Sequence, residues 1–225
     1  EEKVIKITYK ELHHRVSVFA NVLKTHGAKK GDRICLYMPM VPELAIATLA
    51  CARIGAIHSV VFAGFSAKAL ADRINDASCN ILLTSDGSYR GSKQLCLKAI
   101  ADKALELCSS ITSCIVLKRT GENISMKPKR DFWWKEETSK VSSLCKAQQM
   151  DSEDPLFILY TSGSTGKPKG VQHHCGGYMV YAEYSFRNVF QYNQNDVYWC
   201  TADIGWITGH TYIVYGPLLA GATTL

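Results

Sequence analysis

The chain has 225 residues, of which 47% are hydrophobic and 20% charged, and its formal net charge at pH 7 is +6. This apolar content predicts a globular protein with a buried core, arranged as one large domain or two small ones. No apolar run approaches the roughly 20 residues of a membrane helix, and the start EEKVIKITY resembles no signal peptide, which favours a cytoplasmic protein. The basic residues are scattered along the chain, so they indicate small anionic ligands and not a nucleic-acid surface.

The nine cysteines do not form a recognisable metal or disulfide pattern. None belongs to a CxxC pair and their number is odd, so we expect reduced, mostly buried thiols. The neighbouring His173, His174 and Cys175 are interpreted as structural, because three adjacent side chains do not converge on one ion without further ligands. The sequence therefore predicts no metal site in this chain.

The first half of the chain alternates between predicted helices and strands. Thr8 and Glu11 form a capping box, which predicts a helix that begins there and ends at Gly27. The elements expected after it are strand 33–38, helix 42–53, strand 58–62, helix 66–77, strand 80–84, helix 92–107 and strand 114–118. Such alternation predicts an α/β fold with mostly parallel β-sheets flanked by helices.

The alternation lapses over residues 119–152, which we interpret as a connection. Its Trp133 and Trp134 are expected to dock it onto the body of the protein and not to bind a ligand. The pattern resumes with strand 156–161, helix 177–190, strand 197–201, a helix beginning near Thr208 and the opening of a strand in 221–225. We therefore divide the chain into a first β/α subdomain, residues 1–150, and the start of a second, residues 151–225.

The segment 159–170, LYTSGSTGKPKG, predicts a cradle for a polyphosphate. Its glycines let successive N–H groups curl around an anion, its hydroxyl groups donate hydrogen bonds, and its two lysines add positive charge. It is not a Walker A loop, because Lys167 is followed by a proline and not by a hydroxyl residue. A flexible exposed linker is the alternative. Since the segment follows a strand, we expect it at the carboxyl edge of the sheet, where open parallel sheets bind ligands.

The segment YTSGSTGKPKG resembles the signature of the adenylate-forming enzymes. CTADIGWITGH at 200–210 and YRGSK at 89–93 narrow the resemblance to the short-chain acyl-CoA synthetases, and CTADIGWITGH together with DPLFILY before the glycine-rich segment resembles the acetyl-CoA synthetases in particular. This resemblance implies an AMP-forming acetate:CoA ligase, which activates acetate with ATP to acetyl-adenylate and pyrophosphate and then transfers the acetyl group to CoA. It also implies that the chain is a central fragment of the large N-terminal domain, with the adenine site, the magnesium ligands and the catalytic lysine lying elsewhere.

The resemblance assigns roles to three groups of residues, while no catalytic residue is assigned with certainty. CoA is expected at YRGSK, which we place at the start of a helix, where N–H groups and the helix dipole attract phosphate. The alternative for YRGSK is a solvated helix start without a ligand. The alternative for Trp206 and Ile207 is that they are ordinary core residues. The residues are Thr161, Ser162, Gly163, Ser164, Thr165, Gly166 and Lys167 for the ATP phosphates, Arg90, Gly91, Ser92, Lys93 and Thr208 for CoA, and Trp206, Ile207 and Thr208 for the acyl pocket.

The expected partners are thus acetate, ATP with Mg²⁺, and CoA, while the oligomeric state stays open. Ile207 stands where some relatives carry valine, and the added methylene favours acetate over longer acids. A propionate-preferring enzyme and a non-catalytic fragment that binds nucleotide or CoA, or serves as a structural element, are the alternatives. The segment FAGFS at 62–66 resembles FGGFS of bacterial relatives, so Ala63 puts a positive φ at that position in doubt.

Overall fold

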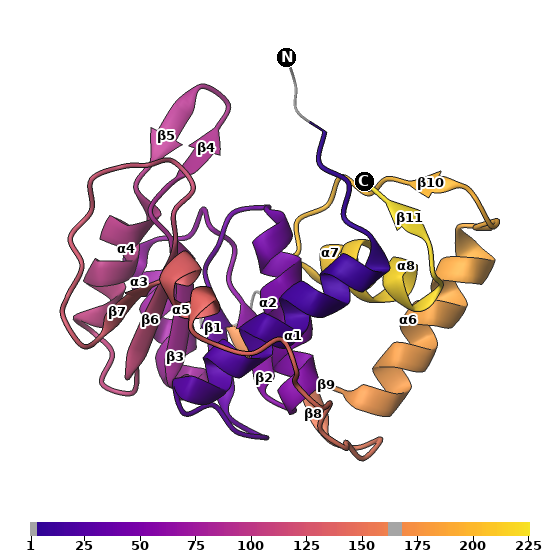
Figure 1. Cartoon of the computed structure of the whole chain (residues 1–225), viewed down its shortest axis with the longest axis horizontal. Coiled ribbons are helices and arrows are strands. Elements are labelled where there is room, and N and C mark those ends of the chain that lie inside the picture. The colour runs from indigo at the N-terminus through magenta and orange to yellow at the C-terminus, as the bar shows by residue number, and fades with distance from the viewer. Residues whose placement is uncertain (1–3, 162–167) are drawn as a thin grey trace.

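A computed structural model describes residues 4–161 and 168–225. Its main feature is a seven-stranded sheet with the order β7-β6-β3-β1-β2-β8-β9 (Figure 1). Neighbouring strands are parallel throughout, except that β8 and β9 are antiparallel. This confirms the predicted α/β class. The strands are β1 (Arg33–Leu36), β2 (Ile57–Val60), β3 (Ile81–Ser85), β6 (Ser113–Leu117), β7 (Asp131–Trp133), β8 (Pro155–Thr161) and β9 (Lys169–His174).

Helices cover both faces of the sheet. α1 (Tyr9–Thr25) and α2 (Pro42–Ile54) pack on one face, and α3 (Ala67–Ala77) and α4 (Leu97–Leu105) pack on the other. Alternate residues of β1 serve the two cores, since Ile34 and Leu36 join the first and Cys35 joins the second. A strand buried on both sides is largely apolar, which is why β1 and β3 read as nearly continuous hydrophobic runs.

The boundaries of the first helix follow the predicted caps only in part. The Thr8 hydroxyl accepts a hydrogen bond from the Glu11 N–H at 3.2 Å, and Gly27 after the helix has a φ of +88°. The Glu11 carboxylate does not return to the cap, because it pairs with the Arg15 guanidinium one turn later. One half of the predicted capping box therefore forms.

Residues 175–219 add further helices on the face that carries α1 and α2. α6 (Cys175–Val189) is followed by a helical run that consists of α7 (Ile207–Gly209), the π-helix η1 (His210–Tyr215) and α8 (Gly216–Leu219). β10 (Val197–Tyr198) pairs in parallel with β11 (Thr223–Thr224), so the strand expected in 221–225 is present. Tyr178 and Tyr215 of these helices join the core on the α1 and α2 face.

Five short elements, β4, β5, β7, α5 and β9, were not predicted, and one predicted helix is wrong at its start. Residues 92–96 are not helical: β4 (Ser88–Arg90) and β5 (Lys93–Leu95) form an antiparallel hairpin, and α4 begins only at Leu97. The two-residue loop has a positive φ at Gly91, +59°, which a tight hairpin requires. The connection contains β7 and the short helix α5 (Trp134–Ser139), and β9 follows the glycine-rich segment.

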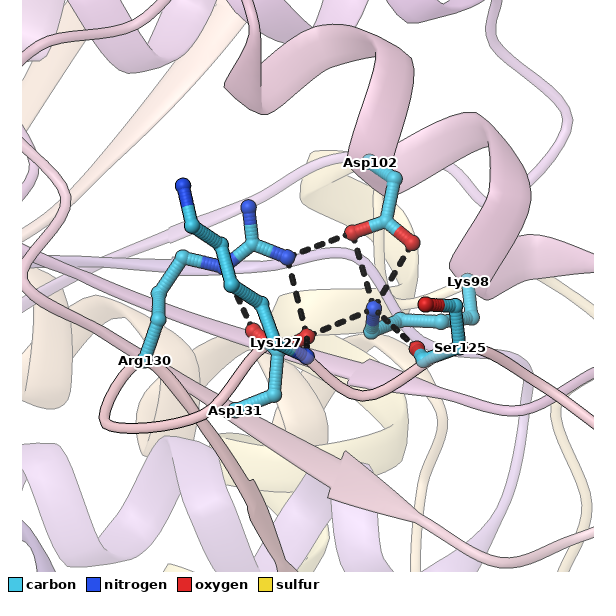
Figure 2. A network of polar contacts seen from close by, with 6 residues as sticks. All are labelled: Lys98, Asp102, Ser125, Lys127, Arg130 and Asp131. Carbon is cyan, nitrogen blue, oxygen red and sulfur yellow. Dashed lines mark hydrogen bonds and ion pairs between the residues drawn. The ribbon is translucent and has the colours of Figure 1, made fainter.

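The connection is tied to the body of the protein by aromatic packing and by buried ions. Trp134 stacks on Phe19 of α1, with ring centroids 3.6 Å apart, which confirms its predicted docking role. On the other side of the sheet, the Lys98 ammonium lies 2.7 Å from Asp102 and 2.8 Å from Asp131 (Figure 2). Arg130 bridges the same two carboxylates and completes a network of two positive and two negative charges.

The cysteines and the helices can be examined over the part of the chain that the structure describes. All nine cysteines are free thiols and are buried or partly buried. The helices of the described segments are all too short or too polar to cross a membrane. β8 and β9 belong to the same sheet as β1, β2, β3, β6 and β7, and the division into residues 1–150 and 151–225 stays a prediction.

Candidate functional site

The connections between strands place a crevice at the centre of the sheet. The chain passes from β1 to β2 through α2 on one face, and from β2 to β3 through α3 on the opposite face. β1 and β3 are neighbours, so the loops that follow them diverge to opposite sides. Open α/β sheets bind ligands at such a topological switch point, outside the carboxyl ends of the strands.

A pocket of about 230 Å³ lies at this switch point. Its walls come from loops that follow β1, β2 and β3 and from two more distant parts of the chain. Arg90 and Arg119 supply positive charge, while Asp203 supplies a carboxyl whose pKa is raised by burial. The pocket is lined by Pro39, Met40, Val41, Phe62, Ala63, Gly64, Ser88, Tyr89, Arg90, Leu95, Arg119 and Asp203. Sequence reasoning missed Met40 and Arg119 in this role, because no local pattern marks them, and it assigned no role to Asp203 although this residue lies in CTADIGWITGH.

The residues predicted to bind the CoA phosphate lie in the hairpin of β4 and β5 and not at the start of a helix. Arg90 and Lys93 are paired across the hairpin, and Gly91 and Ser92 form its exposed tip (Figure 1). Arg90 lines the pocket. Because no helix begins at these residues, the predicted attraction of phosphate by a helix dipole does not apply here. Any affinity for phosphate must come from the side chains and the hairpin backbone.

A buried carboxylate shapes the wall that carries Arg119. Asp86, which follows β3, is fully buried and accepts hydrogen bonds from the N–H groups of Gly87, Arg119, Thr120 and Gly121. Burial raises the pKa of the Asp86 carboxyl, but these four donors outweigh burial and hold the pKa below its ordinary value. Asp86 thus fixes the loop after β6 beside the loop after β3.

Residues 203–206 form a tight turn that leads into α7. The Asp203 carbonyl accepts a hydrogen bond from the Trp206 N–H at 3.0 Å, and its side chain accepts one from the Gly205 N–H at 2.7 Å. A Cβ atom at Gly209 would lie 2.0 Å from the Asp203 carbonyl oxygen. Only glycine therefore permits the close approach that holds Trp206, Ile207 and Thr208 exposed at the surface.

The three predicted acyl-pocket residues do not gather in one hollow. The Trp206 ring lies 6.3 Å from Phe62 and 6.4 Å from Phe65, beside the pocket at the switch point. Ile207 instead lines a second hollow of about 430 Å³, together with His173, Tyr178 and Thr211. Ala63 has no positive φ, so alanine is accommodated in FAGFS without strain.

The two ends of the glycine-rich segment lie in β8 and β9, and these two strands pair with each other. Thr161 at the end of β8 pairs with Lys169 at the start of β9. Because β8 is parallel to β2, this end of the hairpin lies on the same carboxyl edge as the pocket. The predicted phosphate-binding residues Ser162, Gly163, Ser164, Thr165, Gly166 and Lys167 lie outside the described residues.

Two buried histidines lie beneath the turn. His58 of β2 and His210 of η1 are fully buried, with parallel rings whose centroids are 5.3 Å apart. The His210 Nδ1–H donates to the Ile204 carbonyl at 2.5 Å, which ties η1 to the turn. Burial lowers the pKa of His210 to about 4 and that of His58 well below its usual range, so both rings are neutral near pH 7. His173, interpreted as structural, stacks on Phe157 at 4.4 Å.

The fold and the pocket together define the class of the protein. It is an open, mostly parallel α/β protein with a ligand pocket at the switch point and the ends of a glycine-rich segment on the same edge of the sheet. Residues 2–225 match the AMP-binding enzyme family. The chain belongs to that family.

The chain is also similar to proteins named acetyl-coenzyme A synthetase. It is 60% identical over 220 residues to one from Desulfatibacillum aliphaticivorans and 58% identical over 219 residues to one from Alkalilimnicola ehrlichii. These matches cover 98% and 97% of this chain but 34% of each relative. A relative from Nostoc linckia is 55% identical over 98% of the chain and is covered to 65%. The chain thus spans about a third of the length of the first two relatives.

Proposed function

We propose that this chain forms part of an AMP-forming acetate:CoA ligase. The observation that carries the proposal is its identity of 55–60% to acetyl-coenzyme A synthetases over 97–98% of its length. In the first half-reaction, an acetate oxygen would form a bond to the α-phosphorus of ATP, and pyrophosphate would leave. In the second, the CoA thiol would lose its proton and attack the acetyl carbonyl, and AMP would leave with the electron pair of the broken C–O bond.

The glycine-rich segment would serve the first half-reaction. Thr161 to Lys167 would hold the β- and γ-phosphates of ATP through N–H groups, hydroxyls and one ammonium, so their contribution is positioning and charge stabilisation. Mg²⁺ would accompany ATP, but no group of three metal-ligating side chains gathers within residues 4–161 and 168–225. We assign no magnesium ligand to this chain.

The pocket at the switch point would serve the second half-reaction. We assign the CoA 3′-phosphate and adenine to Arg90, Gly91, Ser92 and Lys93, because Arg90 lines the pocket and the other three form the adjoining hairpin tip. Thr208 would lie near the CoA thiol, and Trp206, Ile207 and Thr208 would bound the acyl group. The two proposed subsites would then lie side by side, which is supported by the contacts of Trp206 with Phe62 and Phe65.

A chimera separates the two half-reactions. Residues 1–225 would replace the matching 220-residue segment of the Desulfatibacillum relative. We expect acetate-dependent exchange of pyrophosphate into ATP, together with CoA-dependent formation of acetyl-CoA. Lys167→Ala should strongly lower the exchange. Arg90→Ala should leave the exchange unchanged and raise the KM for CoA roughly tenfold, the loss expected when one charge-assisted contact is removed.

Two outcomes would contradict this proposal. A chimera that folds but catalyses no acetate-dependent exchange would contradict the ligase function and favour a non-catalytic fragment that binds nucleotide or CoA. A higher kcat/KM for propionate than for acetate would instead favour the propionate-preferring alternative. Lys103→Ala is the matched control for Arg90→Ala. Lys103 is an exposed cation of α4, which follows the hairpin in the chain, and it does not line the pocket.

A further inference from the structure

Tyr160 links strands β8 and β9 with helix α3. It is the penultimate residue of β8 and pairs with Gly170 of β9 across the base of the glycine-rich segment. A Cβ atom on Gly170 would lie 3.3 Å from the Tyr160 ring and 3.1 Å from Ile158, so the tyrosine ring lies directly over this glycine. The ring therefore contacts both strands of the hairpin at once.

Helix α3 holds the other side of the tyrosine. The Tyr160 hydroxyl donates to the Asp76 carboxylate at 2.6 Å, and the Arg73 guanidinium carbon lies 5.5 Å from the centre of the Tyr160 ring. Burial, and then the Asp76 carboxylate, raise the pKa of Tyr160, so the phenol keeps its proton and remains a donor. The interactions are a hydrogen bond to a charged acceptor and a cation–π contact.

The same arginine reaches the wall of the pocket. The Arg73 guanidinium carbon lies 4.6 Å from the centre of the Phe65 ring, which packs edge-on against Phe62 and Trp206. The Arg73 Nη1–H donates to the Ala69 carbonyl at 2.7 Å, which fixes the guanidinium along its own helix. Arg73 thus lies between the two aromatic rings that mark the nucleotide side and the pocket side of the carboxyl edge.

We propose that Arg73 and Asp76 of α3 are positioning residues, which fix Tyr160 and the ends of β8 and β9 relative to the pocket at the switch point. This inference rests on the proposed function. Neither residue touches a reacting group: Asp76 acts through the Tyr160 hydroxyl, and Arg73 acts through Tyr160 on one side and Phe65 on the other. Loss of Asp76 should therefore affect the use of ATP alone, whereas loss of Arg73 should affect the use of both ATP and CoA.

Kinetics of the chimera test this division. Tyr160→Phe keeps the ring and removes the hydroxyl, so the KM for ATP in pyrophosphate exchange should rise roughly threefold to tenfold, the range for one lost hydrogen bond, with the KM for CoA unchanged. Asp76→Ala should do the same, and the double variant should be no worse than Tyr160→Phe alone, which removes the bond to Asp76 and the longer contact of the hydroxyl with the Arg73 carbonyl at 3.4 Å. Asp76→Asn keeps an acceptor oxygen and should restore most of the loss.

Arg73→Met tests the second half of the proposal. It keeps an aliphatic chain of similar length between the rings and removes the charge, so both KM values should rise while kcat for the exchange changes little. Lys68→Met is the matched control on the same helix, because Lys68 forms an exposed ion pair with Asp72 and contacts neither ring. An Arg73→Met effect on ATP alone, or an equal effect of Lys68→Met, would overturn this assignment.

Hydrogen exchange on the 225-residue chain gives a readout that does not depend on activity. The amides of Tyr160, Thr161 and Val171 should exchange faster in Asp76→Ala and Tyr160→Phe than in the parent, while amides of β1 should not change. If the parental chimera is inactive, the proposed function fails, and this measurement alone decides the positioning role. If the parent is active and neither KM nor exchange responds to these variants, the positioning role fails and the ligase function stands.

Discussion

Lys98 and Lys68 each stand four residues before an aspartate on a helix, but their surroundings differ. The Lys68 side chain is 74% exposed and pairs with Asp72 in solvent. The Lys98 side chain is 1% exposed, and its partner Asp131 is completely buried. An exposed ion pair contributes little to stability, whereas removing one partner from a buried network leaves a charge without compensation.

This difference predicts the effect of the same substitution at both positions. Lys98→Met leaves two carboxylates facing Arg130 alone, so it should lower the free energy of unfolding by about 3 kcal/mol or more. Lys68→Met should change it by no more than about 0.5 kcal/mol. Urea unfolding followed by circular dichroism measures both values. Equal effects would contradict the view that the network in Figure 2 pins the connection to α4.

Two helical glycines, Gly177 and Gly209, have opposite effects on stability because their surroundings differ. A Cβ atom at Gly177 in α6 would meet no atom within 4 Å apart from the backbone of its own helix and its chain neighbours, whereas a Cβ atom at Gly209 would collide with the Asp203 backbone. Glycine costs a helix conformational entropy at Gly177, but at Gly209 it permits the turn that presents Trp206 and Ile207.

Alanine substitutions should therefore have opposite signs at these two glycines. Gly177→Ala should raise the free energy of unfolding by about 0.5–1 kcal/mol, the usual gain in helix propensity. Gly209→Ala must displace the Asp203 backbone, so it should lower the stability and move Trp206. Thermal unfolding gives the sign, and tryptophan fluorescence reports the displacement. A stable Gly209→Ala variant with unchanged fluorescence would disprove the close approach at Asp203.

The stability of the whole molecule should depend on the buried histidine pair. In the unfolded chain a histidine has a pKa near 6.5, whereas burial lowers the pKa of His210 to about 4. The unfolded state therefore binds more protons as the pH falls below about 6.5, and stability is lost progressively down to the folded pKa. Above pH 6.5 this contribution is fully present.

We expect His210 alone to account for a loss on the order of 2 kcal/mol between pH 7 and pH 5. His210→Asn retains an N–H donor near the Ile204 carbonyl and removes the titrating ring, so the difference between the two pH values should shrink. His13→Gln, at an exposed position of α1, should leave that difference as it is in the parent. Guanidinium unfolding at the two pH values measures the slope, and an unchanged slope in His210→Asn would contradict this account.

The sequence by itself determined the class of the fold and the segments that carry the family resemblance. Local signals were sufficient where the chain's own chemistry decides the outcome. Thr8 caps α1, Gly55 ends α2 with a φ of +71°, and the apolar runs became strands buried on both faces. These features depend on neighbours a few residues away, so a linear pattern records them.

The tertiary structure decided the short strands and the composition of the pocket. Gly91 permits a hairpin at 88–95, although a helix was predicted from residue 92, and β7 and β9 form because β6 and β8 offer them hydrogen-bonding edges. Met40, Arg119 and Asp203 meet in one pocket although the chain separates them widely. The contact between the Arg73 guanidinium and the Tyr160 ring likewise joins α3 to β8, a strand far along the chain. Such contacts arise from packing between remote segments, and no local pattern of residues encodes them.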